Sequence, residues 1–93
     1  MSDCSNHKRE VAGITDMKVL AGMIGDLHYE TLSVFLDELT NKLYLDGAKD
    51  RAAKRFDLAR FLEMAASDIY SAHIEIESAW QISKPFMNSP LNR

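Results

Sequence analysis

The last third of the chain repeats an apolar side chain at every third or fourth position and is followed by a proline. The set is Leu58, Phe61, Leu62, Ala65, Ile69, Ala72, Ile76, Ala79 and Trp80. At about 100° per residue these side chains fall within an arc of roughly 100°, as on a helix that packs along one side. Pro85 is expected to end this helix, because the residue before a proline avoids helical geometry. The pattern predicts an all-α fold.

Composition places the chain among small acidic globular proteins. Its 93 residues suffice for one domain, and a net charge of −3 gives no general electrostatic reason to bind nucleic acid or an anionic membrane. The polar start over 2–7 does not resemble a secretory signal, and Cys4 is the single cysteine. We therefore expect a cytoplasmic protein without an internal disulfide.

Glycines and capping residues divide the chain into three predicted helices. We expect one helical domain over 14–87, a flexible arm over 1–13 and a tail over 88–93. Gly25 and Gly47 are expected to end the first and second helices. The predicted helices cover 17–24, 27–46 (capped by Asp26) and 48–83. Short connections favour antiparallel neighbours, so the last two helices form a hairpin with one long C-terminal arm.

The predicted helix lengths indicate self-association. By the α-helical rise the third helix is about 50 Å long and the second about 28 Å. The overhanging part of the apolar stripe must be covered, and a second copy of the chain is the simplest cover. The sequence thus predicts a bundle completed by a homodimer or larger assembly. Its interface is expected at Ile69, Ala72, Ile76 and Trp80.

Four further apolar residues lie off the stripe of the third predicted helix. They are Phe56, Ile74, Met64 and Ile82. Two interpretations stay open: the helix packs on more than one side against other molecules, or the first two helices straddle it and cover both flanks.

A local basic cluster interrupts the acidic background. Lys49, Arg51, Lys54 and Arg55 fall at the expected start of the third helix, in or beside the line of the apolar stripe. One interpretation is a site for an anion or an acidic partner, aided by the helix N-terminus. The other is a solvated helix end with long side chains lying over the last core layer.

Residues 16–36 resemble a helix-turn-helix. Leu20-Ala21, Gly25 four residues after the alanine, and the apolar residues from Leu32 follow that family's pattern. Leu32 comes one residue late, and the start of the would-be recognition helix carries Asp26 and Glu30 with no basic residue. The acids would repel phosphates, which disfavours DNA binding.

A second resemblance lies at the end of the chain. Ala72, Ile76, Glu77, Ala79 and Lys84 are similar in spacing to the last helix of small phage-encoded helical hairpins that sequester cyclic-nucleotide immune signals. The similarity covers about fifteen residues, and no site residue is carried over from it.

No motif of catalysis, metal binding or cofactor binding stands out. His73, Glu75 and Glu77 alternate by two, which scatters them around a helix. The sequence therefore predicts a non-enzymatic module that acts through protein–protein contact, as an adaptor, inhibitor or assembly factor. The alternative is a nucleic-acid, nucleotide or anion binder that uses 16–36 or the basic end over 49–60, and its binding would weaken steeply with salt.

Overall fold

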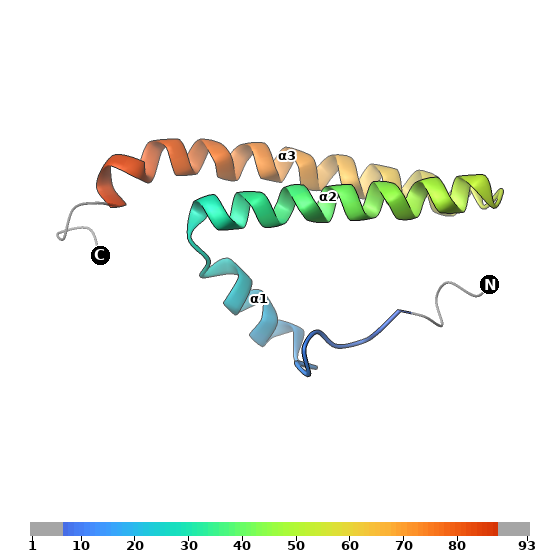
Figure 1. Cartoon of the computed structure of the whole chain (residues 1–93), viewed down its shortest axis with the longest axis horizontal. Coiled ribbons are helices and arrows are strands. Elements are labelled where there is room, and N and C mark those ends of the chain that lie inside the picture. Colours follow the sequence, from blue (N-terminus) through green and yellow to red (C-terminus); the bar gives the residue numbers. More distant parts are fainter. Residues whose placement is uncertain (1–6, 88–93) are drawn as a thin grey trace.

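Three helices make up the part of the chain that the structure, a computed structural model, describes, which is residues 7–87. They are α1 (Met17–Gly25), α2 (Tyr29–Ala52) and α3 (Phe56–Met87), and these residues contain no β-strand. α2 and α3 lie side by side and antiparallel, whereas α1 leaves the start of α2 and points away from the hairpin (Figure 1). The prediction of an all-α fold with a short helix and a hairpin is confirmed.

The turn of the hairpin lies six to eight residues later than predicted. α2 continues through Gly47 to Ala52, so the expected helix end at Gly47 is wrong. A Cβ atom at Gly47 would lie 3.2 Å from Glu63 Cγ and 3.5 Å from the Ala59 carbonyl oxygen. This glycine therefore allows close approach to α3 and does not terminate a helix.

The chain reverses over three residues, 53–55. Lys54 adopts a left-handed conformation (φ 65°), and the Arg55 N–H donates to the Asp50 carbonyl oxygen at 2.8 Å. α3 thus begins at Phe56 and not at residue 48. As a result α2 has 24 residues and α3 has 32, so the two arms differ less than the sequence predicts.

Two other predicted boundaries are also wrong. His28, not Asp26, caps α2: its Nδ1 accepts the Glu30 N–H at 3.1 Å, while Asp26 follows the last turn of α1. α3 passes through Pro85 to Met87. A proline in the last turn removes one hydrogen bond but has a φ compatible with a helix, so one more turn can follow.

Small side chains at intervals of seven residues form the contact line between α2 and α3. Ser33, Thr40 and Gly47 are buried on α2, and Ala59 and Ala66 are fully buried on α3. Ser33 bonds to His73 and Gly47 faces Ala59, which sets an antiparallel register with Thr40 opposite Ala66. A spacing of seven keeps side chains on one line of a helix pair. Because these residues are small, the backbones approach closely and the large apolar side chains are left at the sides.

The contact line also explains why the predicted stripe is not the centre of the hairpin. Ala59 and Ala66 each follow a stripe residue, Leu58 and Ala65, by one position, which is a rotation of about 100°. Half of the stripe therefore points sideways. α2 and α3 form a single layer from which α1 projects on one side (Figure 1), and the radius of gyration of 16.5 Å exceeds the roughly 12 Å expected for a compact chain of this length.

The described part of the predicted arm contains a tight turn. Val11 and Ile14 exchange backbone hydrogen bonds of 3.1 and 2.8 Å around Ala12 and Gly13, both with positive φ. Residues 1–6 of the arm and the predicted tail over 88–93 lie outside the described residues.

Candidate functional site

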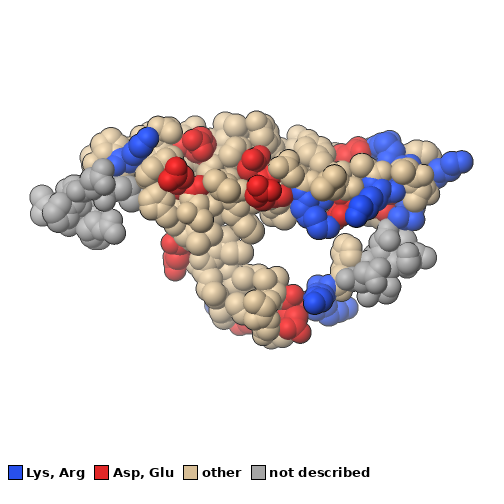
Figure 2. Space-filling model, in the orientation of Figure 1, with Lys and Arg blue, Asp and Glu red and all other residues tan. Residues whose placement is uncertain are grey.

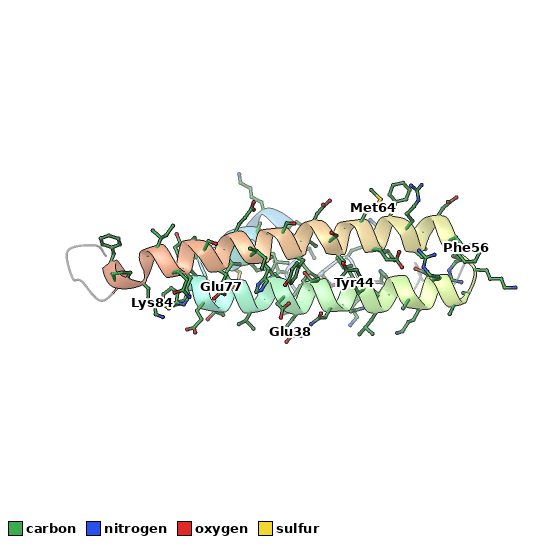
Figure 3. The ribbon with its side chains drawn as sticks, turned by 90° about the horizontal axis from the view of Figure 1, so that it is seen from above. Glu38, Tyr44, Phe56, Met64, Glu77 and Lys84 are labelled. Carbon is green, nitrogen blue, oxygen red and sulfur yellow. The ribbon has the colours of Figure 1, made fainter. Side chains whose placement is uncertain are left out.

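One face of the hairpin is polar and is held by contacts between the two helices. Arg51 pairs with Glu63 through bonds of 3.0 and 2.6 Å, and Ser33 donates to Glu77 at 2.9 Å. Figure 3 views this face from above, on the side away from α1, with Tyr44 and Glu77 labelled. The hydrogen bonds from Arg51 lower the pKa of the Glu63 carboxyl from its usual value.

The opposite face, on the side where α1 lies, is apolar except near the turn, where the Lys42–Asp46 ion pair borders it on α2. At about 100° per residue its residues lie roughly 140–180° around α3 from Glu63 and roughly 100–160° around α2 from Arg51. We call this the α1-side face. Its residues are Leu32 and Leu39 of α2 and Leu58, Ala65, Ala72 and Ala79 of α3, each set spaced by seven, while Phe35 and Phe61 lie at its outer edges.

Large side chains on the α1-side face stay accessible. The Phe61 side chain is 57% exposed, and Leu58 and Phe35 are also exposed. The Arg60 guanidinium carbon lies 4.8 Å from the centre of the Phe61 ring, over one side of that ring. A phenyl ring and several aliphatic side chains on one face form a surface suited to another apolar surface.

α1 adds a second uncovered apolar element. Its sequence, MKVLAGMIG, holds one charged residue, and the helix contains no buried residue. Met17, Val19 and Met23 are exposed, while Leu20 and Ile24 are only partly covered. A helix that is apolar on all sides is normally enclosed by other structure. In the single chain it is not enclosed, and Figure 2 shows open space between α1 and the end of the hairpin that carries the turn.

The four off-stripe residues of α3 are all exposed. Figure 3 shows Met64 on the outer edge of α3, away from α2, whereas Phe56 lies one heptad before Glu63 and therefore on the polar face, and Ile74 and Ile82 are exposed as well. Within the described residues the first two helices do not straddle α3, because α1 makes no extensive contact with it. The second of the two open interpretations is therefore wrong.

The predicted interface residues occupy three different places. Ile69 and Ile76 are half-buried beside the contact line with α2. Ala72 lies on the α1-side face. Trp80 meets the His28 ring edge-on at a centroid distance of 4.6 Å, which fastens the start of α2 to α3.

The predicted basic cluster is divided by ion pairs. Arg51 binds Glu63, and Arg55 binds Asp50 at 2.7 Å, where the Asp50 residue is 4% exposed. Lys49 and Arg51 lie in the last turn of α2, where the helix dipole favours cations, and not at the start of α3. Among residues 7–87, Lys49 and Lys54 form no ion pair.

The structure brings together three residues that the sequence left apart. His73 Nδ1 lies 2.8 Å from the Ser33 carbonyl oxygen and 3.0 Å from Ser33 Oγ, while that hydroxyl donates to Glu77. A carbonyl oxygen only accepts, so Nδ1 carries the hydrogen and cannot take a proton from Ser33. The Ser33 residue is 1% exposed. This cluster fastens the helices and lacks the geometry of a nucleophile with its base. The spacing of seven that links Ser33 to Thr40 and Ala66 to His73 is the signal that could have found it.

No group of three or more His, Cys, Asp or Glu side chains in 7–87 is placed to hold a metal ion. None of the helices in that range combines the length and apolar character that a membrane span requires.

Comparison with known proteins finds no matching family model, no similar characterised sequence and no similar solved structure. The function must therefore be argued from the surfaces of this chain.

Proposed function

We propose that this chain is a small non-enzymatic helical module that acts through protein–protein contact, as an adaptor, inhibitor or assembly factor, and that it works as a homo-oligomer. The observation that carries the proposal is the α1-side face together with the apolar helix α1. Both expose large apolar side chains beside each other in one concave region (Figures 1 and 2). Burying such side chains contributes roughly 25 cal/mol per Å² of apolar surface removed from water.

The rest of the molecule supports the same proposal. Interfaces use apolar or aromatic centres with polar rims, and here Phe61 and Leu58 are bordered by charged residues such as Arg60 and Asp57. In the part of the chain that the structure describes, the cluster of Ser33, His73 and Glu77 joins α2 to α3. Anion binding by Lys49 and Lys54 stays a prediction, and the pairing of Arg51 and Arg55 with carboxylates weakens its basis.

Two phenylalanines of α3 provide a matched test. Phe61 lies at the outer edge of the α1-side face and is 57% exposed, whereas Phe56 lies on the opposite, polar face and is 54% exposed. Wild type, Phe61→Ser and Phe56→Ser are used as baits in extracts of the native host, with quantitative mass spectrometry. We expect the specifically bound protein, including untagged copies of the chain itself, to be lost with Phe61→Ser and kept with Phe56→Ser. Equal recovery with both variants would contradict the assignment of the face.

Circular dichroism of both variants is the control. Each replaced ring is more than half exposed, so the helical signal and the melting temperature should stay close to those of the wild type.

A further inference from the structure

Resting on the proposed function, we infer that the α1-side face is covered by a second copy of this chain, packed face to face with its hairpin turn at the opposite end. The arrangement is an antiparallel four-helix bundle. Three properties of the described residues point to this occupant: the amount of uncovered surface, the distribution of charge along the hairpin and the shape of the single layer.

The total exposed surface of the chain exceeds that of a compact chain of its mass. The chain exposes 7127 Å², whereas a compact folded chain of 10.5 kDa is expected to expose about 5400 Å². A stable complex of standard size removes roughly 800 Å² from each partner. The excess surface is large enough to supply one such interface.

Charge is divided along the hairpin. Thr40 and Ala66 face each other at its middle and separate a turn half (41–66) from a distal half (29–40 with 67–87). The turn half holds six basic and four acidic residues, net +2, whereas the distal half holds one basic and six acidic residues, net −5. Figure 2 shows most basic side chains of the hairpin gathered at the turn end.

This division makes the hairpin complementary to itself in one direction only. In a two-fold symmetric pair each surface meets its own copy. If the turns lie at opposite ends, the positive half of each copy lies over the negative half of the other. If the turns lie together, the two halves of net −5 face each other, which is repulsive.

The shape agrees with a second layer. A helical hairpin covers each helix on one side only, and bundles complete their core with two further helices. A second hairpin on the α1-side face would cover Leu58 and the inner sides of Phe35 and Phe61.

Pulsed electron paramagnetic resonance tests the direction of packing. A nitroxide is attached at Ala53→Cys in the turn, on the full chain with Cys4→Ser. With turns at opposite ends the two labels should lie roughly 35–50 Å apart, because α2 alone is about 36 Å long. With turns together they would lie within about 25 Å, since packed helices are 8–10 Å apart.

Only the long distance supports the inference. A short distance, or the absence of a dipolar signal at concentrations up to the millimolar range, would overturn it. If no dipolar signal appears but Phe61→Ser abolishes capture of another protein, the proposed function is supported. The inference that a second copy covers the face is then wrong.

A charge-reversed variant is an independent check. Lys49→Glu with Lys54→Glu changes the turn half from +2 to −2 and touches no ion pair of the described residues. Self-association measured by sedimentation should weaken about tenfold at low salt, with a smaller loss at high salt, where surface charges are screened. Unchanged or stronger association would contradict the opposed charge halves.

Discussion

Asp50 is the residue whose environment differs most from what its type suggests. It is 4% exposed, whereas the other charged residues of 7–87 are exposed or half-buried, and Arg55 binds it from the turn. A carboxylate at this depth requires such a partner, because an unpaired buried charge is costly. The arginines of the turn region therefore stabilise the hairpin through ion pairs. A count of basic residues in the sequence does not reveal this structural role.

Two substitutions that each remove one positive charge from the turn should have opposite effects. Arg55→Gln takes the guanidinium from Asp50 and should lower the free energy of unfolding by about 2–3 kcal/mol. Lys54→Gly should leave stability unchanged or raise it by about 0.5 kcal/mol, since a side chain at φ 65° is strained there. Urea denaturation measures both. Equal effects would mean that net charge, not the Asp50 contact, governs the stability of the turn.

The pair of Arg51 and Glu63 gives a prediction for pH. The pKa of Glu63 is lower in the folded chain than in the unfolded chain, chiefly because Arg51 donates hydrogen bonds to its carboxylate. The pair therefore stabilises the fold above the unfolded pKa, and that contribution is lost as the pH falls through the folded pKa. In Arg51→Gln the pKa of Glu63, followed by NMR titration, should rise toward its ordinary value. Arg51→Lys should give an intermediate value, because it keeps the charge without the paired donors. An unchanged pKa in Arg51→Gln would contradict the contact.

At the scale of elements, the hairpin is organised by its smallest residues. The stripe from Leu58 to Trp80 predicts the existence and most of the length of α3, because helical periodicity is a local property. It does not predict which side of α3 meets α2, since that depends on Ala59 and Ala66, whose small size matters only opposite Gly47 and Thr40. For the same reason the sequence predicts a helix end at Gly47, because a glycine that terminates a helix and a glycine that allows close packing have the same sequence signal.

Gly47 provides the test at this scale. Gly47→Leu should separate the helices near the turn and destabilise the fold by about 1–3 kcal/mol, because the added side chain meets Ala59 and Leu62. Gly47→Ala should be close to neutral: its Cβ would lie 3.2 Å from the flexible Glu63 Cγ, while alanine gains about 1 kcal/mol of helix propensity. Thermal unfolding followed by circular dichroism measures both. A leucine variant as stable as the wild type would contradict the close contact line.

At the scale of the whole molecule, the chain has a complete contact line but an incomplete core. Of the candidate site, the sequence predicts that apolar side chains remain uncovered and that self-association follows. It does not predict that α1 stands apart, nor that Ile69 and Ile76 lie beside the contact line with α2, because both depend on how three helices pack in space. The incomplete core is the central claim, and the α1-side face is its location.

Hydroxyl-radical footprinting of purified wild-type chain at increasing concentration tests this claim most directly, because it compares two rings of one residue type. Phe61 and Phe56 are 57% and 54% exposed in the single chain, so their oxidation rates should be similar at low micromolar concentration. As the concentration rises, we expect Phe61 to become protected as a second copy covers the α1-side face, while the rate at Phe56 stays constant. Equal oxidation of both rings at every concentration would contradict the account.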